Sequence, residues 1–104
     1  MRSKKMAKRK IVWSHRAQIK LFEVLQYYSD RNKSNKYSAK LYQKFNKELK
    51  LLHKHPDLGI RTELESVRGL IIGDYIIFYE ETSDKIIVHT LWDSRQNPAD
   101  LRLK

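Results

Sequence analysis

Cysteine is absent from this 104-residue chain, and so are long apolar runs. Without cysteine, the protein can form neither a disulfide framework nor a thiolate metal site. No segment approaches the roughly 18 consecutive apolar residues that a membrane-spanning helix needs. No apolar stretch of the kind found in secretory signals follows the basic start. We therefore expect a cytoplasmic protein that works without a membrane, a metal or a cofactor.

Acidic residues are scarce. The chain has 12 Asp and Glu against 22 Lys and Arg, so its formal net charge is 22 − 12 = +10. This excess favours an acidic or phosphate-bearing partner, although lysines can also serve solubility alone. Residues 1–9 are expected to form a flexible basic tail, with a phosphate-binding arm as the alternative. Six of the first ten residues are basic: Arg2, Lys4, Lys5, Lys8, Arg9 and Lys10. If Met6 rather than Met1 is the start, the first three of these are lost.

Two amphipathic helices are predicted in the first half of the chain. Residues 10–13 are typical of a short strand, and Ser14 follows where a helix N-cap belongs. The polar stretch 30–35 connects the first helix to a second one over about 37–53, which Pro56 ends. A link this short predicts an antiparallel hairpin. Apolar residues recur at helical spacing, namely Ala17, Leu21, Val24, Leu25 and Tyr28 in the first helix and Leu41 or Tyr42, Phe45, Leu49 and Leu52 in the second.

The second half of the chain changes to strand character. Residues 67–72, 75–81 and 85–92 are rich in Ile, Val, Tyr and Phe, and turns too short for a parallel crossover separate them. The predicted fold is α+β with the order β-α-α-β-β-β. The helical hairpin packs on one face of a small antiparallel sheet, and the place of the N-terminal strand stays open. We expect one domain over 10–98 and a C-terminal tail over 99–104.

Four segments carry a resemblance to a known family. Residues 11–14 (IVWS), 52–59 (LHKHPDLG), 67–79 (VRGLIIGDYIIFY) and 91–98 (LWDSRQNP) resemble the first strand, the end of the second helix, the two central strands and the ending of RelE/ParE-type toxins. That superfamily, which includes plasmid stabilisation proteins, has the fold predicted above. The resemblance spans residues 11–98.

The resemblance implies a growth-inhibiting toxin of a bacterial type II toxin–antitoxin system. A cognate acidic antitoxin would neutralise it, in a toxin–antitoxin hetero-oligomer. ParE-like members poison DNA gyrase, whereas RelE-like members cleave mRNA on the ribosome. A third reading, a nucleic-acid-binding domain that is no toxin, ranks last because the sequence has no helix-turn-helix or aromatic–glycine RNA-binding motif.

Cleavage of RNA without a metal needs acid–base groups and cations around the phosphate. Candidate catalytic residues are Arg95, His89 and Arg68, and candidate contacts to a target or nucleic acid are Arg68, Tyr75, Tyr79, Arg95, Lys50 and Lys54. We expect the groups on the strands and at the rim of the sheet to stand on the face that the helices leave open, whereas Lys50 and Lys54 belong to the lysine-rich sides of the second helix. His89 is expected to share its face with Ile87 and Leu91, and Tyr75 and Tyr79 to share theirs with Ile77.

Each of these residues also has a structural alternative. Arg95 can pair with Asp93 or Glu80, and Arg68 with Glu63 or Glu65. The two tyrosines and His89 can be packed and hydrogen-bonded instead of exposed. His53 and His55 read as solvated residues at a helix end and lack a third metal ligand.

The sequence departs from the nuclease pattern at two positions. RNA-cleaving relatives often carry arginines on the central strands, where Ile71 and Ile76 stand here. The histidine–tyrosine ending of some ribosome-dependent members is also missing. These departures favour a ParE-like toxin that acts by binding.

Overall fold

The first strand leads directly into the first helix through a capping serine. The computed structural model describes residues 9–103, and β1 (Lys10–Trp13) precedes α1 (His15–Asn32). The Ser14 hydroxyl accepts the Ala17 N–H (3.1 Å) and donates to the His89 carbonyl (3.0 Å). One side chain therefore both caps α1 and ties its start to the sheet.

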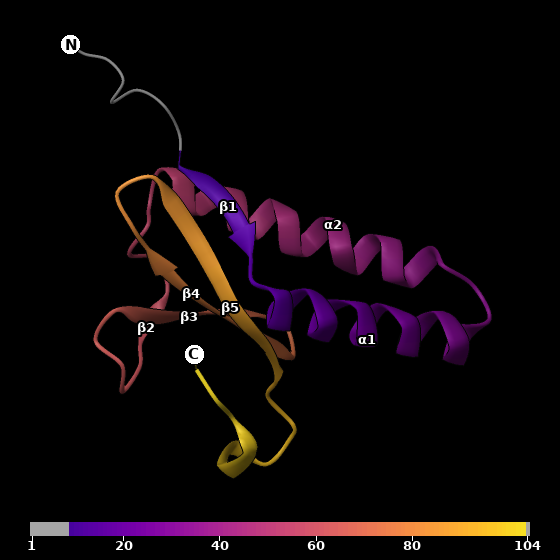
Figure 1. The fold of residues 1–104 in the computed structure, drawn as a ribbon. Helices are drawn as coiled ribbons and strands as arrows, with labels where there is room; N and C mark the ends of the chain where they lie inside the picture. The colour runs from indigo at the N-terminus through magenta and orange to yellow at the C-terminus, as the bar shows by residue number, and fades with distance from the viewer. Residues whose placement is uncertain (1–8, 104) are drawn as a thin grey trace.

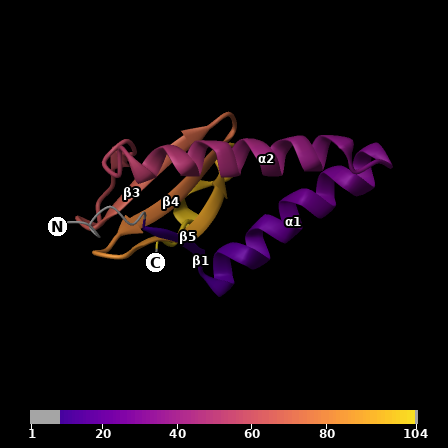
Figure 2. The ribbon, with the colours of Figure 1, turned by 90° about the horizontal axis from the view of Figure 1, so that it is seen from above.

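The two helices form the predicted hairpin. After α1, the chain turns through Lys33, which adopts a left-handed conformation, into α2 (Lys36–Lys50) and a short 3-10 turn, η2 (Leu51–His53). Buried Ser38 joins the helices: its hydroxyl lies 2.6 Å from the Leu25 carbonyl oxygen and 2.9 Å from the Ser29 hydroxyl. The hairpin covers one face of the sheet and projects beyond it (Figure 2).

Five strands make one mixed sheet. After β2 (Ile60–Arg61) come β3 (Val67–Ile72), β4 (Tyr75–Glu81) and β5 (Lys85–Asp93), and the spatial order is β1-β5-β4-β3-β2 (Figure 1). Strands β2 to β5 pair antiparallel, while β1 runs parallel to β5. Gly73 has φ +60° in the β3–β4 turn, a conformation that side chains other than glycine rarely adopt.

A β-bulge interrupts the alternation of β5. Thr90 pairs with Phe78 and Val88 pairs with Tyr79, so His89 is an extra residue between them. Val88 and Leu91 consequently both face the helices. The prediction that His89 and Leu91 share a face is therefore wrong, because the bulge shifts the alternation by one residue.

The core has two parts on opposite faces of the sheet. Between sheet and helices lie Ala17, Leu41, Phe45, Leu49, Leu52, Leu70, Ile72, Tyr75, Ile77, Tyr79, Ile86, Val88 and Leu91. On the other face, Val67, Phe78 and Trp92 form a smaller cluster, against which Leu101 and Leu103 pack. The C-terminal segment, which includes η3 (Pro98–Asp100), thus covers part of the face that we expected to be open.

The α+β fold and its helical hairpin are confirmed, and the predicted strands and helices match within a few residues. Three details differ: β1 makes the sheet mixed, β2 is additional, and Leu101 and Leu103 of the predicted C-terminal tail pack on the sheet. Arg9, placed in the N-terminal tail, forms an ion pair with Glu81 (2.9 Å). Residues 1–8, the rest of that predicted tail, lie outside the described residues.

Candidate functional site

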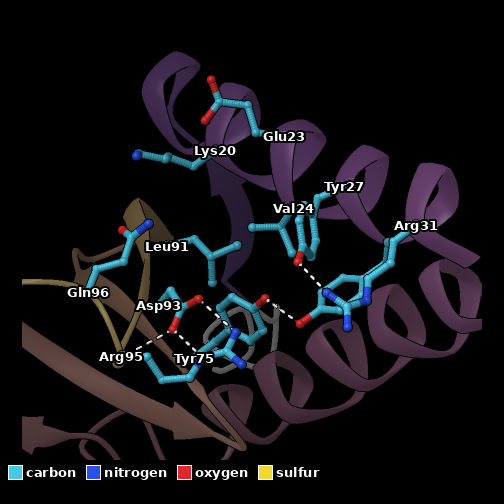
Figure 3. Close-up of a pocket in the computed structure, with 11 residues that line it drawn as sticks. Lys20, Glu23, Val24, Tyr27, Arg31, Tyr75, Leu91, Asp93, Arg95 and Gln96 are labelled. Atoms are coloured by element: carbon cyan, nitrogen blue, oxygen red, sulfur yellow. Dashed lines mark hydrogen bonds and ion pairs between the residues drawn. The ribbon is translucent and has the colours of Figure 1, made fainter.

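A groove of about 590 Å³ runs between α1 and the end of β5 (Figure 3). We call it the α1–β5 groove. It is lined by Lys20, Glu23, Val24, Tyr27, Tyr28, Arg31, Tyr75, Leu91, Asp93, Arg95 and Gln96. Aromatic rings, an apolar floor and charged rims meet in one concavity, as is usual for binding sites.

One wall of the groove is a side of α1. Lys20, Val24, Tyr27 and Arg31 are spaced i, i+4, i+7 and i+11, so they line one side of the helix. The Arg31 guanidinium donates to the Tyr27 hydroxyl (2.9 Å), which fixes both side chains along the rim (Figure 3). This wall therefore presents an aromatic surface with a cation at each end.

The opposite wall comes from the ends of the central strands. Tyr75 at the start of β4 pairs directly with Asp93 at the end of β5. After Asp93 the chain turns, and the Ser94 N–H and hydroxyl both donate to the Asp74 carbonyl oxygen (2.8 Å each). The turn that carries Arg95 is therefore fastened to the β3–β4 turn.

Arg95 is held by Asp93 in a bidentate pair. Its Nε lies 2.9 Å from Asp93 Oδ1 and its Nη2 lies 2.8 Å from Asp93 Oδ2, while Asp74 is a looser neighbour at 3.8 Å. The hydrogen bonds from Arg95 lower the pKa of Asp93, and the same contact raises the pKa of Arg95. Of the two alternatives for an internal pair, Asp93 is the one observed.

Two tyrosine hydroxyls meet at the bottom of the groove. The Tyr75 hydroxyl donates to the Tyr28 hydroxyl (3.2 Å). That hydrogen bond, followed by one from Arg95, lowers the pKa of Tyr28, whereas burial raises the pKa of Tyr75. Tyr28 is thus the acceptor of this hydrogen bond, which favours the charged form of its hydroxyl, and Tyr75 is the donor.

The charges of the groove leave a positive surplus. Glu23 and Asp93 oppose Lys20, Arg31 and Arg95, and Asp93 is already occupied by Arg95. Within residues 9–103, the ammonium group of Lys20 takes part in no ion pair or hydrogen bond. The groove can accept a chain segment with acidic and apolar side chains.

The remaining predicted site residues lie elsewhere. Arg68 faces the helix side, where its cross-strand partner is Tyr79, and its Nη1 donates to the Gly59 carbonyl (2.9 Å). Neither Glu63 nor Glu65 pairs with it among the described residues. Arg68 lines a smaller hollow of about 220 Å³.

Tyr79 and Tyr75 do not stand on the open face. Both belong to the core beneath the helices, and Tyr79 is only 1% exposed. The expectation that these rings are placed to stack on a base is wrong, because alternation along β4 turns them toward the helices. Burial raises the pKa of Tyr79.

His89 is the one catalytic candidate on the sheet face away from the helices. Its Nε2 lies 2.8 Å from Glu80 Oε1, and both side chains are about four-fifths buried (17% and 21% exposed). This is the packed, partnered histidine of the structural alternative. Lys50 and Lys54 are exposed at the end of α2 and after η2, away from the groove lining.

A family comparison agrees with this architecture. The model of the ParE toxin of the type II toxin–antitoxin system parDE matches residues 11–98. The chain belongs to the ParE toxin family. Among solved structures, "Chromosomal ParDE TA system from P. aeruginosa" is similar with a TM-score of 0.69 at 16% identity, over 81% of this chain and 94% of that chain. At that identity the likeness concerns the fold. No curated protein matches the chain.

In this ParE-family chain, the sequence predicts only some of the residues that line the groove. Arg95 and Tyr75 were named, but Lys20, Tyr27 and Arg31 were not, although their i, i+7, i+11 spacing beside the apolar stripe of α1 is a usable signal. Within residues 9–103 no group of three or more acidic or histidine side chains is arranged to hold a metal ion. None of the helices in that part combines the length and apolarity needed to cross a bilayer.

Proposed function

We propose that this ParE-family toxin inhibits growth by binding DNA gyrase, and that a cognate acidic antitoxin neutralises it. Gyrase is a cytoplasmic enzyme, so the chain would act in the cytoplasm. The observation that supports binding over mRNA cleavage is the dispersion of Arg68, His89 and Arg95. A metal-free nuclease needs its acid, base and cations around one phosphate.

The three candidates stand in three different places. Arg68 and Arg95 lie on the helix side but at opposite ends of the sheet, beside Tyr79 and Tyr75 respectively. Those tyrosines are four positions apart along β4, a distance of about 13 Å. His89 lies on the opposite face of the sheet, where it contacts Glu80. No single phosphate can contact all three.

The face around His89 also lacks cations on its central strands. Ile71 and Ile76 pair across β3 and β4, and Ile71 is 57% exposed. Aliphatic side chains at these positions cannot stabilise a charged phosphorane. Exposed Ile71, beside half-buried Ile76, is better suited to contact a protein surface.

The test is a pair of assays on the full-length chain. We expect it to inhibit supercoiling by DNA gyrase and to leave mRNA on programmed ribosomes intact. Ile71→Ser, which keeps the strand but removes the exposed apolar side chain, is expected to weaken the inhibition. Ile60→Ser, at another exposed isoleucine, is the control. Cleavage of the mRNA that Arg95→Ala and His89→Ala abolish would overturn the proposal in favour of the nuclease.

The α1–β5 groove is the site that we assign to the antitoxin. A segment with acidic side chains would pair with Lys20 and Arg31 at the rim, and apolar side chains would cover Val24 and Leu91. Such a segment is typically disordered when free and folds as it binds. The net charge of +10 would speed its association.

Charge reversal in the groove tests this assignment. The antitoxin is the product of the neighbouring reading frame, co-expressed with the toxin. Lys20→Glu with Arg31→Glu is expected to weaken the complex about tenfold or more, which corresponds to about 1.4 kcal/mol. Lys10→Glu with Lys85→Glu makes the same change in charge away from the groove and serves as the control. An equal loss in both variants would argue against the groove.

A further inference from the structure

Helix α2 bears a one-sided row of lysines. It carries five lysines and a single glutamate in 15 residues. Lys36, Lys40, Lys44 and Lys47 fall within an arc of about 80° at 100° per residue, on the side away from the buried Leu41, Phe45 and Leu49. We call these four side chains the α2 lysine face. In Figure 2, α2 crosses above the strands and no described element lies over it.

These lysines are not used inside the described structure. All four are exposed, and none of their ammonium groups forms an ion pair or hydrogen bond within residues 9–103. The ammonium group of Lys44 lies close to Gly73, so the β3–β4 turn borders the row at its middle. Four unneutralised charges of one sign on a rigid helix repel one another, and an extended anion would relieve this repulsion.

We propose that the α2 lysine face binds the phosphate backbone of duplex DNA. From Lys36 to Lys47 the row rises by 11 residue steps, about 16 Å of helix axis, which matches about five base pairs at 3.4 Å each. Lysine is a hydrated point charge on a flexible stem, suited to phosphates along a groove edge without base-specific contacts.

An acidic protein segment fits this face less well. The centres of protein interfaces are enriched in aromatic anchors and depleted in lysine. None of the four lysines lines the α1–β5 groove or the smaller hollow beside Arg68, and no apolar residue of α2 falls within their arc, whereas the α1–β5 groove has an apolar floor. The charge of the α2 lysine face is therefore complementary to a uniform polyanion. This inference does not depend on gyrase being the target.

Fluorescence anisotropy of a labelled 20-base-pair duplex, measured at several salt concentrations with the full-length chain, tests the proposal. Replacing the four lysines by glutamine is expected to weaken binding at least tenfold at low salt. The slope of log Kobs against log salt should become shallower by about 3 to 4, since each phosphate contact contributes about 0.9. The four-arginine variant should keep the parent's affinity and slope.

A charge-matched control separates this face from the charge of the whole molecule. Lys10, Arg61, Lys85 and Arg102 are exposed on β1, β2, β5 and the C-terminal segment. Their replacement by glutamine should change the slope by about 1 or less. An equal loss in the control, an unchanged slope in the α2 variant, or no binding by the parent would overturn the proposal. So would an α2 variant that loses antitoxin binding but keeps DNA binding.

Discussion

The hydroxyl of Tyr79 joins β4 to the loop that follows the helices. It accepts the Gly59 N–H (2.9 Å) and donates to the Pro56 carbonyl (2.8 Å). Gly59 has no room for a side chain, because a Cβ there would lie 2.7 Å from the Tyr79 ring and 2.9 Å from the Gly69 carbonyl oxygen. This close approach explains why a glycine precedes β2.

Tyr79→Phe is expected to destabilise the protein by about 1–3 kcal/mol, because it leaves a buried N–H and a carbonyl without their partner. Urea denaturation followed by circular dichroism measures the change. Tyr42→Phe is the matched control, since Tyr42 is 45% exposed, and it should change stability by less than about 0.5 kcal/mol. Equal effects would show that the two hydrogen bonds of Tyr79 contribute nothing specific.

Asp93 gives the fold a defined acid sensitivity. Arg95 lowers its pKa in the folded state below the ordinary value of 3.8. The pair therefore stabilises the fold fully above about pH 5 and loses this contribution as the pH falls through the folded pKa. Asp93→Asn should lower the urea midpoint near pH 6 and flatten its fall toward about pH 2. Asp57→Asn is the control, and a parallel fall in Asp93→Asn and the parent would contradict the prediction.

At the scale of elements, the local sequence pattern was enough to predict the helices and strands that have a distinct pattern of their own. The apolar stripe of α1 from Ala17 to Tyr28, the Ser14 cap and the three long strands are all present as predicted. The bulge at His89 could not be predicted, because the shift in strand pairing at a bulge is not accompanied by a characteristic residue composition. The parallel pairing of β1 depends on a partner about 75 residues away, which local periodicity does not encode.

The C-terminal segment is an element whose role appears only in three dimensions. Leu101 and Leu103 lie against Phe78 and Trp92, which are 5% and 7% exposed. Replacing both leucines by alanine is expected to cost about 1–3 kcal/mol. It should also shift the tryptophan emission to longer wavelength as Trp92 becomes hydrated.

Arg102→Ala, in the same segment but exposed, should leave both the stability and the emission unchanged. If the double leucine variant behaves like Arg102→Ala, the segment does not protect this face in solution.

At the scale of the molecule, the candidate site is a meeting of distant segments. The α1–β5 groove needs α1, the start of β4 and the turn after β5, and the last two are brought together by the pairing of Tyr75 with Asp93 and by the hydrogen bonds from Ser94 to Asp74. Sequence patterns identify Arg95 and Tyr75 as candidate site residues, but they predict both on the open face of the sheet. A charge excess of +10 predicts an anionic partner without saying which surface receives it.

The molecule has two positively charged surfaces of different chemistry. The α1–β5 groove has aromatic walls and lies on the side of α1 away from α2, whereas the α2 lysine face is a bare row of ammonium groups. The β3–β4 turn lies between them: Asp74 contacts Arg95 on one side, and Gly73 lies near Lys44 on the other. An acidic segment confined to the groove is expected to leave the lysine row free.

The toxin is consequently expected to hold an acidic peptide and duplex DNA at the same time. An antitoxin peptide that lacks the DNA-binding part should lower the affinity for duplex only modestly, through its charge. The salt slope should stay within about 1 of the value for the free chain, because the same four phosphate contacts are made. The four-glutamine α2 variant should bind the peptide as the parent does, which controls for damage to the groove. Full displacement of the duplex by the peptide would show that the two surfaces overlap.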